Sequence, residues 1–142
     1  MENKKPISIT IEATIDAPVE KVWQFWNDPQ HITQWNAASD DWHCPHSTVE
    51  LKVGGKFSST MAAKDGSMSF DFGGIYTAIE KHQLIEQKLE DERKVKIQFL
   101  SQNGKTKVIE TFDAEGENTI EMQKNGWQAI LDNFRRHVEK NK

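Results

Sequence analysis

Residues 68–79 read Met-Ser-Phe-Asp-Phe-Gly-Gly-Ile-Tyr-Thr-Ala-Ile, and this stretch predicts a bent β-strand. Phe70 and Phe72 alternate with polar residues, which is the period of a strand with one buried face. After Gly73-Gly74 the apolar positions resume at Ile75 with the opposite parity. A bulge or a sharp bend at the glycine pair would produce that change. We therefore expect a strongly curved sheet with one concave face.

Alternating segments on both sides of this stretch extend it into a meander of six antiparallel strands. Turn residues separate these segments, most clearly at Asp65-Gly66 and Asn103-Gly104. The six strands are expected at residues 49–53, 57–61, 68–79, 85–91, 95–101 and 105–113. Isoleucines alternate with polar residues over 7–15 as well, so the sheet should contain about seven strands.

Two short helices are predicted between the first strand and the meander. Pro18 lies near the first position of one helix, where its missing N–H costs nothing. Asp28-Pro29 gives the same start signal for a second helix that ends near Trp35. Trp23 and Trp26 have helical spacing on the first helix, and we expect them to pack in the core of the helix pair.

A long amphipathic helix is predicted at the C-terminal end. Its apolar stripe consists of Ile120, Trp127, Ile130, Leu131, Phe134 and Val138. Asn118 followed by Glu121 resembles a capping box, and a start nearer Asn125 is the alternative. Gly126 interrupts the stripe beside Trp127, which indicates either close packing or an opening there.

The predicted order of elements, β-α-α-β6-α, is typical of an α+β domain. A long amphipathic helix is the natural cover for the concave face of a curved antiparallel sheet. This is the helix-grip arrangement, which tends to leave a cavity between the sheet and the C-terminal helix. We expect a single domain over residues 1–142.

Short motifs along nearly the whole chain resemble the SRPBCC superfamily, which has the START or Bet v 1-like fold. Within it they resemble the family named after the C-terminal domain of the activator of Hsp90 ATPase. The motifs are Ala17–Trp23, Asp28–Trp35, Gly54–Phe57, Asp65-Gly66, Gly74–Tyr76 and Gly126–Leu131. The resemblance implies a helix-grip fold, a ligand cavity bordered by aromatic residues, and a variable loop at the cavity mouth around residues 42–46. It also implies a stress-response role through a chaperone.

Composition excludes several function classes. Lys and Arg total 18 against 22 Asp and Glu, a net charge of −4, which argues against a nucleic-acid binder. No apolar run approaches the roughly 20 residues that span a bilayer, so we expect no membrane insertion. A lone Cys44 and a start without a signal peptide predict a cytoplasmic protein. We expect a monomer or a weak dimer.

The candidate ligand-binding residues are large side chains that the alternation turns inward, together with one carboxyl group. They are Trp35, Trp42, Phe57, Met61, Phe70, Phe72, Phe99, Glu110, Trp127 and Leu131. Any single aromatic residue in this set is more simply explained as core, whereas the group suits an apolar or aromatic small molecule. Glu110 shares parity with Val108 and Phe112, so it should point inward with a raised pKa, as a site group or a structural one.

One segment, residues 42–46, carries metal-capable side chains. His43, Cys44 and His46 could supply three ligands, but their spacing matches no zinc pattern and a fourth ligand is not evident. We expect no metal and no cofactor.

Three functions compete. The first, which we expect rather than an enzyme, is a binding protein that holds a small hydrophobic or aromatic molecule beneath the C-terminal helix. The second is a chaperone-associated module that binds Hsp90, although the co-chaperone has an additional N-terminal domain without a counterpart here, so we do not expect ATPase stimulation. The third is a cyclase- or dehydratase-like enzyme that uses His43, His46, Asp71 or Glu110; Asp71 should face solvent because it alternates with Phe70 and Phe72.

Overall fold

The computed structural model describes residues 7–141, which form one seven-stranded antiparallel sheet and three helices. The elements are β1 (Ser8–Ile15), α1 (Val19–Asn27), α2 (Pro29–Trp35), β2 (Trp42–Val49), β3 (Lys56–Ala63), β4 (Ser69–Glu80), β5 (Leu84–Leu89), β6 (Lys94–Gln102), β7 (Lys105–Asp113) and α3 (Ile120–Lys140). The strand order is β1-β7-β6-β5-β4-β3-β2, so the first strand closes the far edge of a six-stranded meander.

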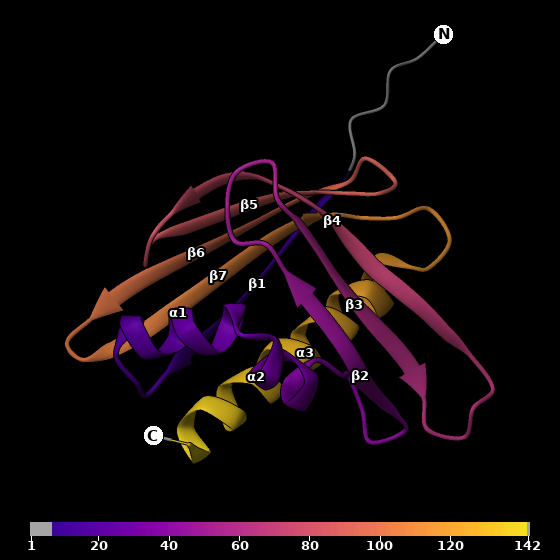
Figure 1. Cartoon of the computed structure of the whole chain (residues 1–142), viewed down its shortest axis with the longest axis horizontal. Helices are drawn as coiled ribbons and strands as arrows, with labels where there is room; N and C mark the ends of the chain where they lie inside the picture. Colours follow the sequence, from indigo (N-terminus) through magenta and orange to yellow (C-terminus); the bar gives the residue numbers. More distant parts are fainter. Residues whose placement is uncertain (1–6, 142) are drawn as a thin grey trace, which may run out of the picture.

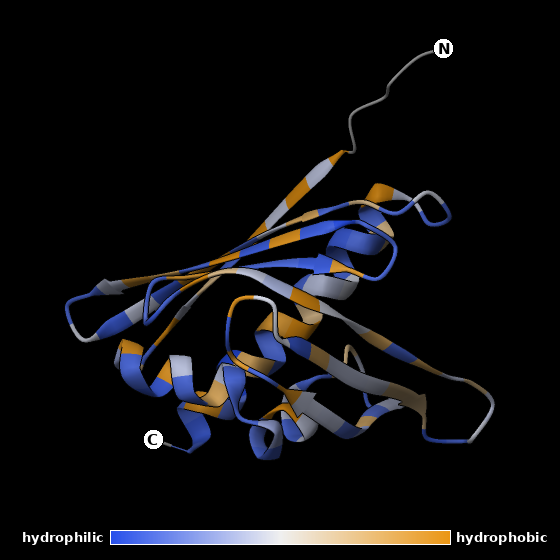
Figure 2. Cartoon of the chain, turned by 45° about the horizontal axis from the view of Figure 1, so that its top comes forward, coloured by the Kyte–Doolittle hydropathy of each residue, from blue (hydrophilic) through white to orange (hydrophobic). Residues whose placement is uncertain are grey.

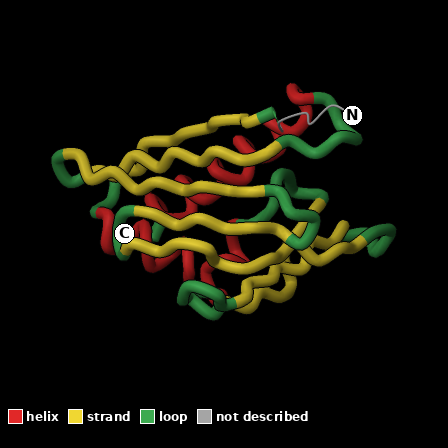
Figure 3. The backbone as a smooth tube through the Cα atoms, turned by 90° about the horizontal axis from the view of Figure 1, so that it is seen from above, coloured by secondary structure: helices red, strands yellow, loops and turns green. Residues whose placement is uncertain are grey.

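The sheet curls around the long helix. In Figure 1, β2, β3 and β4 run steeply across the direction of β1 and β5–β7, and α3 lies along the face between them. Figure 3 shows the strands side by side in one layer with the helices behind them. Apolar and polar residues alternate along the strands, as expected for a sheet with one covered face (Figure 2). The predicted α+β helix-grip fold is confirmed.

The bulge in β4 lies at Thr77 and not at the glycine pair, contrary to our prediction. Pairing with β5 runs from Gly74 opposite Leu89 to Tyr76 opposite Gln87, and then shifts by one residue. Tyr76 therefore faces the concave side and is 3% exposed, whereas Ile75 faces out.

The two glycines allow neighbouring strands to approach β4 closely. A Cβ on Gly74 would lie 2.1 Å from the carbonyl oxygen of Lys88, and one on Gly73 would lie 2.4 Å from that of Phe57. Any larger residue at either position would push a strand away, so the pair permits the curvature although it does not shift the register.

The strand β2 occupies residues that we expected to form a loop. It spans Trp42–Val49, and the predicted strand positions Leu51 and Val53 are exposed beyond its end. Pro45 lies in an irregularity of the pairing between His43 and His46, at the edge of the sheet. Proline is tolerated there because a bulge on an edge strand needs no ladder hydrogen bond from it.

Side-chain caps set the starts of α2 and α3. The Asp28 carboxylate accepts a hydrogen bond from the Gln30 N–H at 2.9 Å, as the Asp-Pro signal indicates. Thr119, not Asn118, caps α3, and its hydroxyl accepts from the Met122 N–H at 3.1 Å. Asn118 lies one residue before the cap, where its backbone N–H and its side-chain amide both donate to the carboxylate of Glu115, at 2.6 and 3.1 Å.

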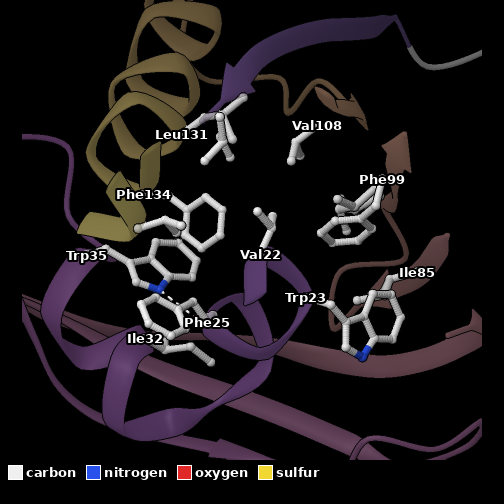
Figure 4. Packing of buried hydrophobic residues seen from close by; sticks show 14 of the residues in the cluster. Val22, Trp23, Phe25, Ile32, Trp35, Ile85, Phe99, Val108, Leu131 and Phe134 are labelled. Carbon is white, nitrogen blue, oxygen red and sulfur yellow. Dashed lines mark hydrogen bonds between the residues drawn. The ribbon is translucent and has the colours of Figure 1, made fainter. Parts of the chain in front are cut away.

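The main core lies where α1, α2 and the C-terminal part of α3 meet β6 and β7. Figure 4 shows Val22, Phe99, Val108, Leu131 and Phe134 pointing toward one another, all buried. Two polar contacts join the helices at this end. The Trp35 indole N–H donates to the Phe25 carbonyl at 3.1 Å, and Nδ1 of His31 lies 3.0 Å from Nε2 of His137.

Candidate functional site

A cavity of about 460 Å³ lies between the concave face of the sheet and the N-terminal half of α3. Side chains of α1, α2, β2–β5, β7 and α3 contribute to its wall. Its volume falls within the range of small-molecule sites, and its wall is mostly apolar with a few polar groups.

Aromatic rings form one continuous side of the cavity. Trp127 of α3 stacks flat on Phe112, with ring centroids 3.8 Å apart, and meets the edge of Phe72 at 5.8 Å. Phe57 and Tyr76 continue this series, with ring centroids 5.1 Å apart. This side of the cavity therefore combines rings of β3 and β4 with a ring of α3.

The helix pair supplies a second group of rings. The ring centroids of Trp26 and Trp35 lie 5.2 Å apart, and both side chains also line the cavity. Trp26 therefore packs in the core, as expected, and faces the cavity as well.

Gly126 leaves an opening in the cavity wall. A Cβ built at this position would meet nothing within 4 Å, so of the two roles predicted for the glycine the structure supports the opening. Two other lining residues are exposed to solvent. They are Met122, one helical turn before Gly126, which is 61% exposed, and Phe70 of β4, which is 50% exposed. These two residues mark the part of the wall that solvent reaches.

Glu110 is the buried carboxyl group of the cavity. It lies on β7 directly between Ile11 of β1 and Ile97 of β6, and it is only 8% exposed. The side chain thus points inward, as the alternation in β7 predicts. Burial raises the pKa of Glu110 to about 8, and no hydrogen bond offsets that effect among the described residues. The carboxyl group is consequently mostly protonated at neutral pH.

Other polar groups lie nearby on the same concave face. Burial raises the pKa of Tyr76 to about 12, so its phenol stays neutral and can donate a hydrogen bond. The amide of Gln87 lines the cavity from the strand position opposite Tyr76. Ser47 and Ser59 bond to each other across β2 and β3 at 3.1 Å.

The predicted acid–base residues do not converge. Asp71 faces out, as expected, and accepts a hydrogen bond from the Thr60 hydroxyl at 2.8 Å. His43 and His46 are exposed, and neither lines the cavity that holds Glu110. The geometry therefore offers Glu110 no second acid–base group from this set.

The metal-capable segment does not form a converging set either. Cys44 is buried and free, and burial raises the pKa of its thiol, whereas the flanking His43 and His46 face solvent. Within residues 7–141, no group of three or more His, Cys, Asp or Glu side chains is placed to hold a metal ion. In the same range no helix has the length and apolar character needed to cross a bilayer.

Seven of the ten predicted site residues line the cavity. They are Trp35, Phe57, Met61, Phe70, Phe72, Glu110 and Trp127. Trp42, Phe99 and Leu131 lie outside the lining: Trp42 packs on Phe70, Phe99 on Trp23, and Leu131 in the core.

Sequence reasoning missed Tyr76, Gln87 and Gln123, which also line the cavity. Tyr76 keeps the parity of Phe70 and Phe72, so uninterrupted alternation through the glycines would have identified it. Gln123 carried no such signal; its side chain bridges the loop before α3, with its amide oxygen 2.8 Å from the Glu115 N–H.

The model of the family described as Activator of Hsp90 ATPase homolog 1-like protein matches residues 16–139. The chain belongs to this family. The SRPBCC-type fold and the family suggested by the sequence motifs are thus confirmed. No match was found among curated proteins.

Solved structures agree with this assignment. An AHSA1-like protein from Aeromonas hydrophila is 51% identical, with a TM-score of 0.89, over 95% of this chain and 94% of its own. A protein from Cytophaga hutchinsonii is 50% identical, with a TM-score of 0.82, over 94% and 93%. A protein from Chromobacterium violaceum shares the fold at a TM-score of 0.83 with 20% identity, over 94% and 99%.

Proposed function

We propose that this protein binds a small hydrophobic or aromatic molecule in the cavity beneath α3. The observation that carries the proposal is a cavity of about 460 Å³ walled by aromatic side chains from both the sheet and the helices. Interiors are otherwise close-packed, and large rings arranged around an unfilled space are typical of a ligand site.

The experiment fills the cavity with a side chain and measures binding. Gly126→Leu places an isobutyl group in the open space at the cavity wall. Gly116→Leu is the matched control, because a Cβ there also meets nothing within 4 Å and Gly116 lies outside the lining.

A panel of neutral aromatic and lipid probes should change the tryptophan fluorescence of the wild type and of Gly116→Leu, since Trp127 and Trp35 line the cavity. Gly126→Leu should weaken binding at least about tenfold, because the added side chain occupies ligand volume. Equal binding by all three proteins, or no binding by the wild type, contradicts the proposal.

The family supports a second candidate, a module that associates with the Hsp90 chaperone. A pulldown and an ATPase assay with the cognate Hsp90 test it directly. Absence of binding at tens of micromolar, a weak affinity by the usual arithmetic, would remove this candidate. We place either role in the cytoplasm, where a free, unpaired cysteine such as Cys44 is ordinary.

A further inference from the structure

Glu110 lies at a position where the burial of a carboxyl group is energetically unfavourable. In the strand register its neighbours on either side are Ile11 and Ile97, and Ile85 follows in the same row across the sheet. A carboxyl group among aliphatic side chains loses its hydration and gains nothing from these neighbours. Its free side faces the cavity, since Glu110 is part of the lining.

Within residues 7–141, no free basic side chain compensates Glu110 inside the cavity. Arg93 is the basic residue that this part of the chain contributes to the cavity lining, and its Nε already lies 2.7 Å from the carboxylate of Asp91. The other charged lining residue, Glu115, is acidic. An anionic ligand such as a fatty acid would bring a third carboxyl group to this wall, where its charge would find no free basic partner and would be repelled by Glu115.

The aromatic wall favours positive charge. Faces of Trp, Tyr and Phe rings attract cations through their quadrupole, most strongly where water is excluded. Trp26 and Trp35 line the cavity from the helices, and Phe57, Phe72 and Trp127 line it from the sheet side and α3. A lone buried carboxyl group together with such rings is the recognition chemistry of an organic ammonium ion.

We propose that the ligand is a hydrophobic amine whose ammonium group pairs with the Glu110 carboxylate while its apolar part contacts the aromatic wall. This inference rests on the proposed function, because it assigns the ligand class of the same cavity. The proton balance is explicit: the ammonium ion enters protonated, Glu110 loses its proton to solvent, and a carboxylate–ammonium pair remains.

The released proton makes binding depend on pH. Burial raises the pKa of Glu110 to about 8, so the affinity for an ammonium ion should rise about tenfold per pH unit up to pH 8. The protonation states of Tyr76 and Glu115, which also line the cavity, should not change over this pH range. Burial raises the pKa of Tyr76 to about 12, and hydrogen bonds from Asn118 lower the pKa of Glu115.

The test compares three probes with one skeleton by titration calorimetry: naphthylethylamine, naphthylethanol and naphthylacetic acid. At pH 8 the wild type should bind the amine at least about tenfold more tightly than the alcohol, and the acid most weakly. Glu110→Gln should abolish the preference for the amine and its pH dependence, while it keeps binding of the alcohol. Glu121→Gln, which removes an exposed carboxylate of α3 outside the lining, is the control and should keep both.

The outcomes separate this inference from the proposed function. If the alcohol binds as tightly as the amine, or if Glu110→Gln retains the preference, the amine proposal is wrong and the hydrophobic cavity stands. If the acid binds best, the charge argument is wrong. If none of the three probes binds, both the amine proposal and the proposed function are overturned.

Discussion

The two halves of α3 meet the same sheet in different ways. In the closed half, residues 131–140, Leu131, Phe134 and Val138 are almost completely buried against α1, α2 and the sheet. In the open half, residues 120–130, Met122 is mostly exposed and Gly126 faces empty space. The buried contacts of the closed half can therefore stabilise the fold. The open half needs to contribute less to stability, so a cavity can remain beneath it.

The largest effect should come from the closed half. Phe134 contacts both Trp26 and Trp35 edge-on, with ring centroids 4.9 and 4.8 Å away. Phe134→Ala should lower the free energy of unfolding by about 4 kcal/mol, because it removes a fully buried ring. Urea unfolding measures this loss. Phe72→Ala, at the cavity wall where Phe72 meets Trp127 of the open half, should cost about 1 kcal/mol, since its ring is only partly buried. Equal losses would refute the comparison.

The second effect concerns the free energy of unfolding that is lost by burying Glu110 in the cavity beneath the open half. Because the pKa of Glu110 is raised, the folded protein holds a proton that the unfolded chain releases between pH 4.5 and 8. The free energy of unfolding should thus fall by up to about 1.4 kcal/mol per pH unit as pH rises through this window.

Glu110→Gln should remove that dependence and should be more stable than the wild type by about 3 kcal/mol at neutral pH. Urea unfolding of both proteins from pH 5 to pH 8 provides the measurement. If the free energy of unfolding depends on pH in the same way in both proteins, the carboxyl group of Glu110 is not the cause of this dependence.

A smaller effect concerns the helix itself. Gly126→Ala should stabilise the protein by about 1 kcal/mol, because alanine is the better helix former and its Cβ meets nothing within 4 Å. Thermal unfolding detects such a change. Gly116→Ala, outside the helices, should be nearly neutral. Destabilisation by Gly126→Ala would mean that the space is occupied in solution.

The smallest effect lies at the end of the closed half. Burial, then the charges of His31 and Lys140, lower the pKa of His137. The unfolded chain therefore binds more protons near the ordinary histidine pKa, and stability should fall as pH decreases through about 6.5.

The imidazole of His137 is only partly buried and solvent still screens it, so the loss should not exceed about 0.5 kcal/mol. It is measured in the Glu110→Gln background, where the opposite trend of the carboxyl group is absent. His137→Gln should flatten the remaining slope, and an unchanged slope would assign the effect to another group.

Local signals in the sequence predicted those features that depend on neighbouring residues. The Asp28-Pro29 start of α2 is one, and the Asn103-Gly104 hairpin is another, with positive φ values of 53° and 82°. The inward orientation of Glu110 also follows from alternation within β7 alone. Each of these depends on a few consecutive residues, which a single sequence displays.

Features that depend on distant strands were not predictable in this way. The bulge at Thr77 exists only in the pairing of β4 with β5, so the sequence alone placed the change of parity at the glycine pair instead. The edge strand β2 has no clear alternation because Pro45 interrupts its ladder. Likewise, the alternation in the sequence identifies large side chains on the concave face of the sheet. Whether a cavity remains between them depends on where α3 packs, which the sequence does not show.

The irregularity at Pro45 also affects how this sheet meets other chains. An exposed edge strand can recruit a further strand, which is a route to aggregation. On β1, α3 occupies backbone groups: the Gln128 amide donates to the Glu12 carbonyl, and the Glu139 carboxylate accepts from the Asp16 N–H. On β2, the opposite edge, a proline within a bulge removes a donor and breaks the regular ladder. Both edges are thereby protected against sheet extension by a second polypeptide.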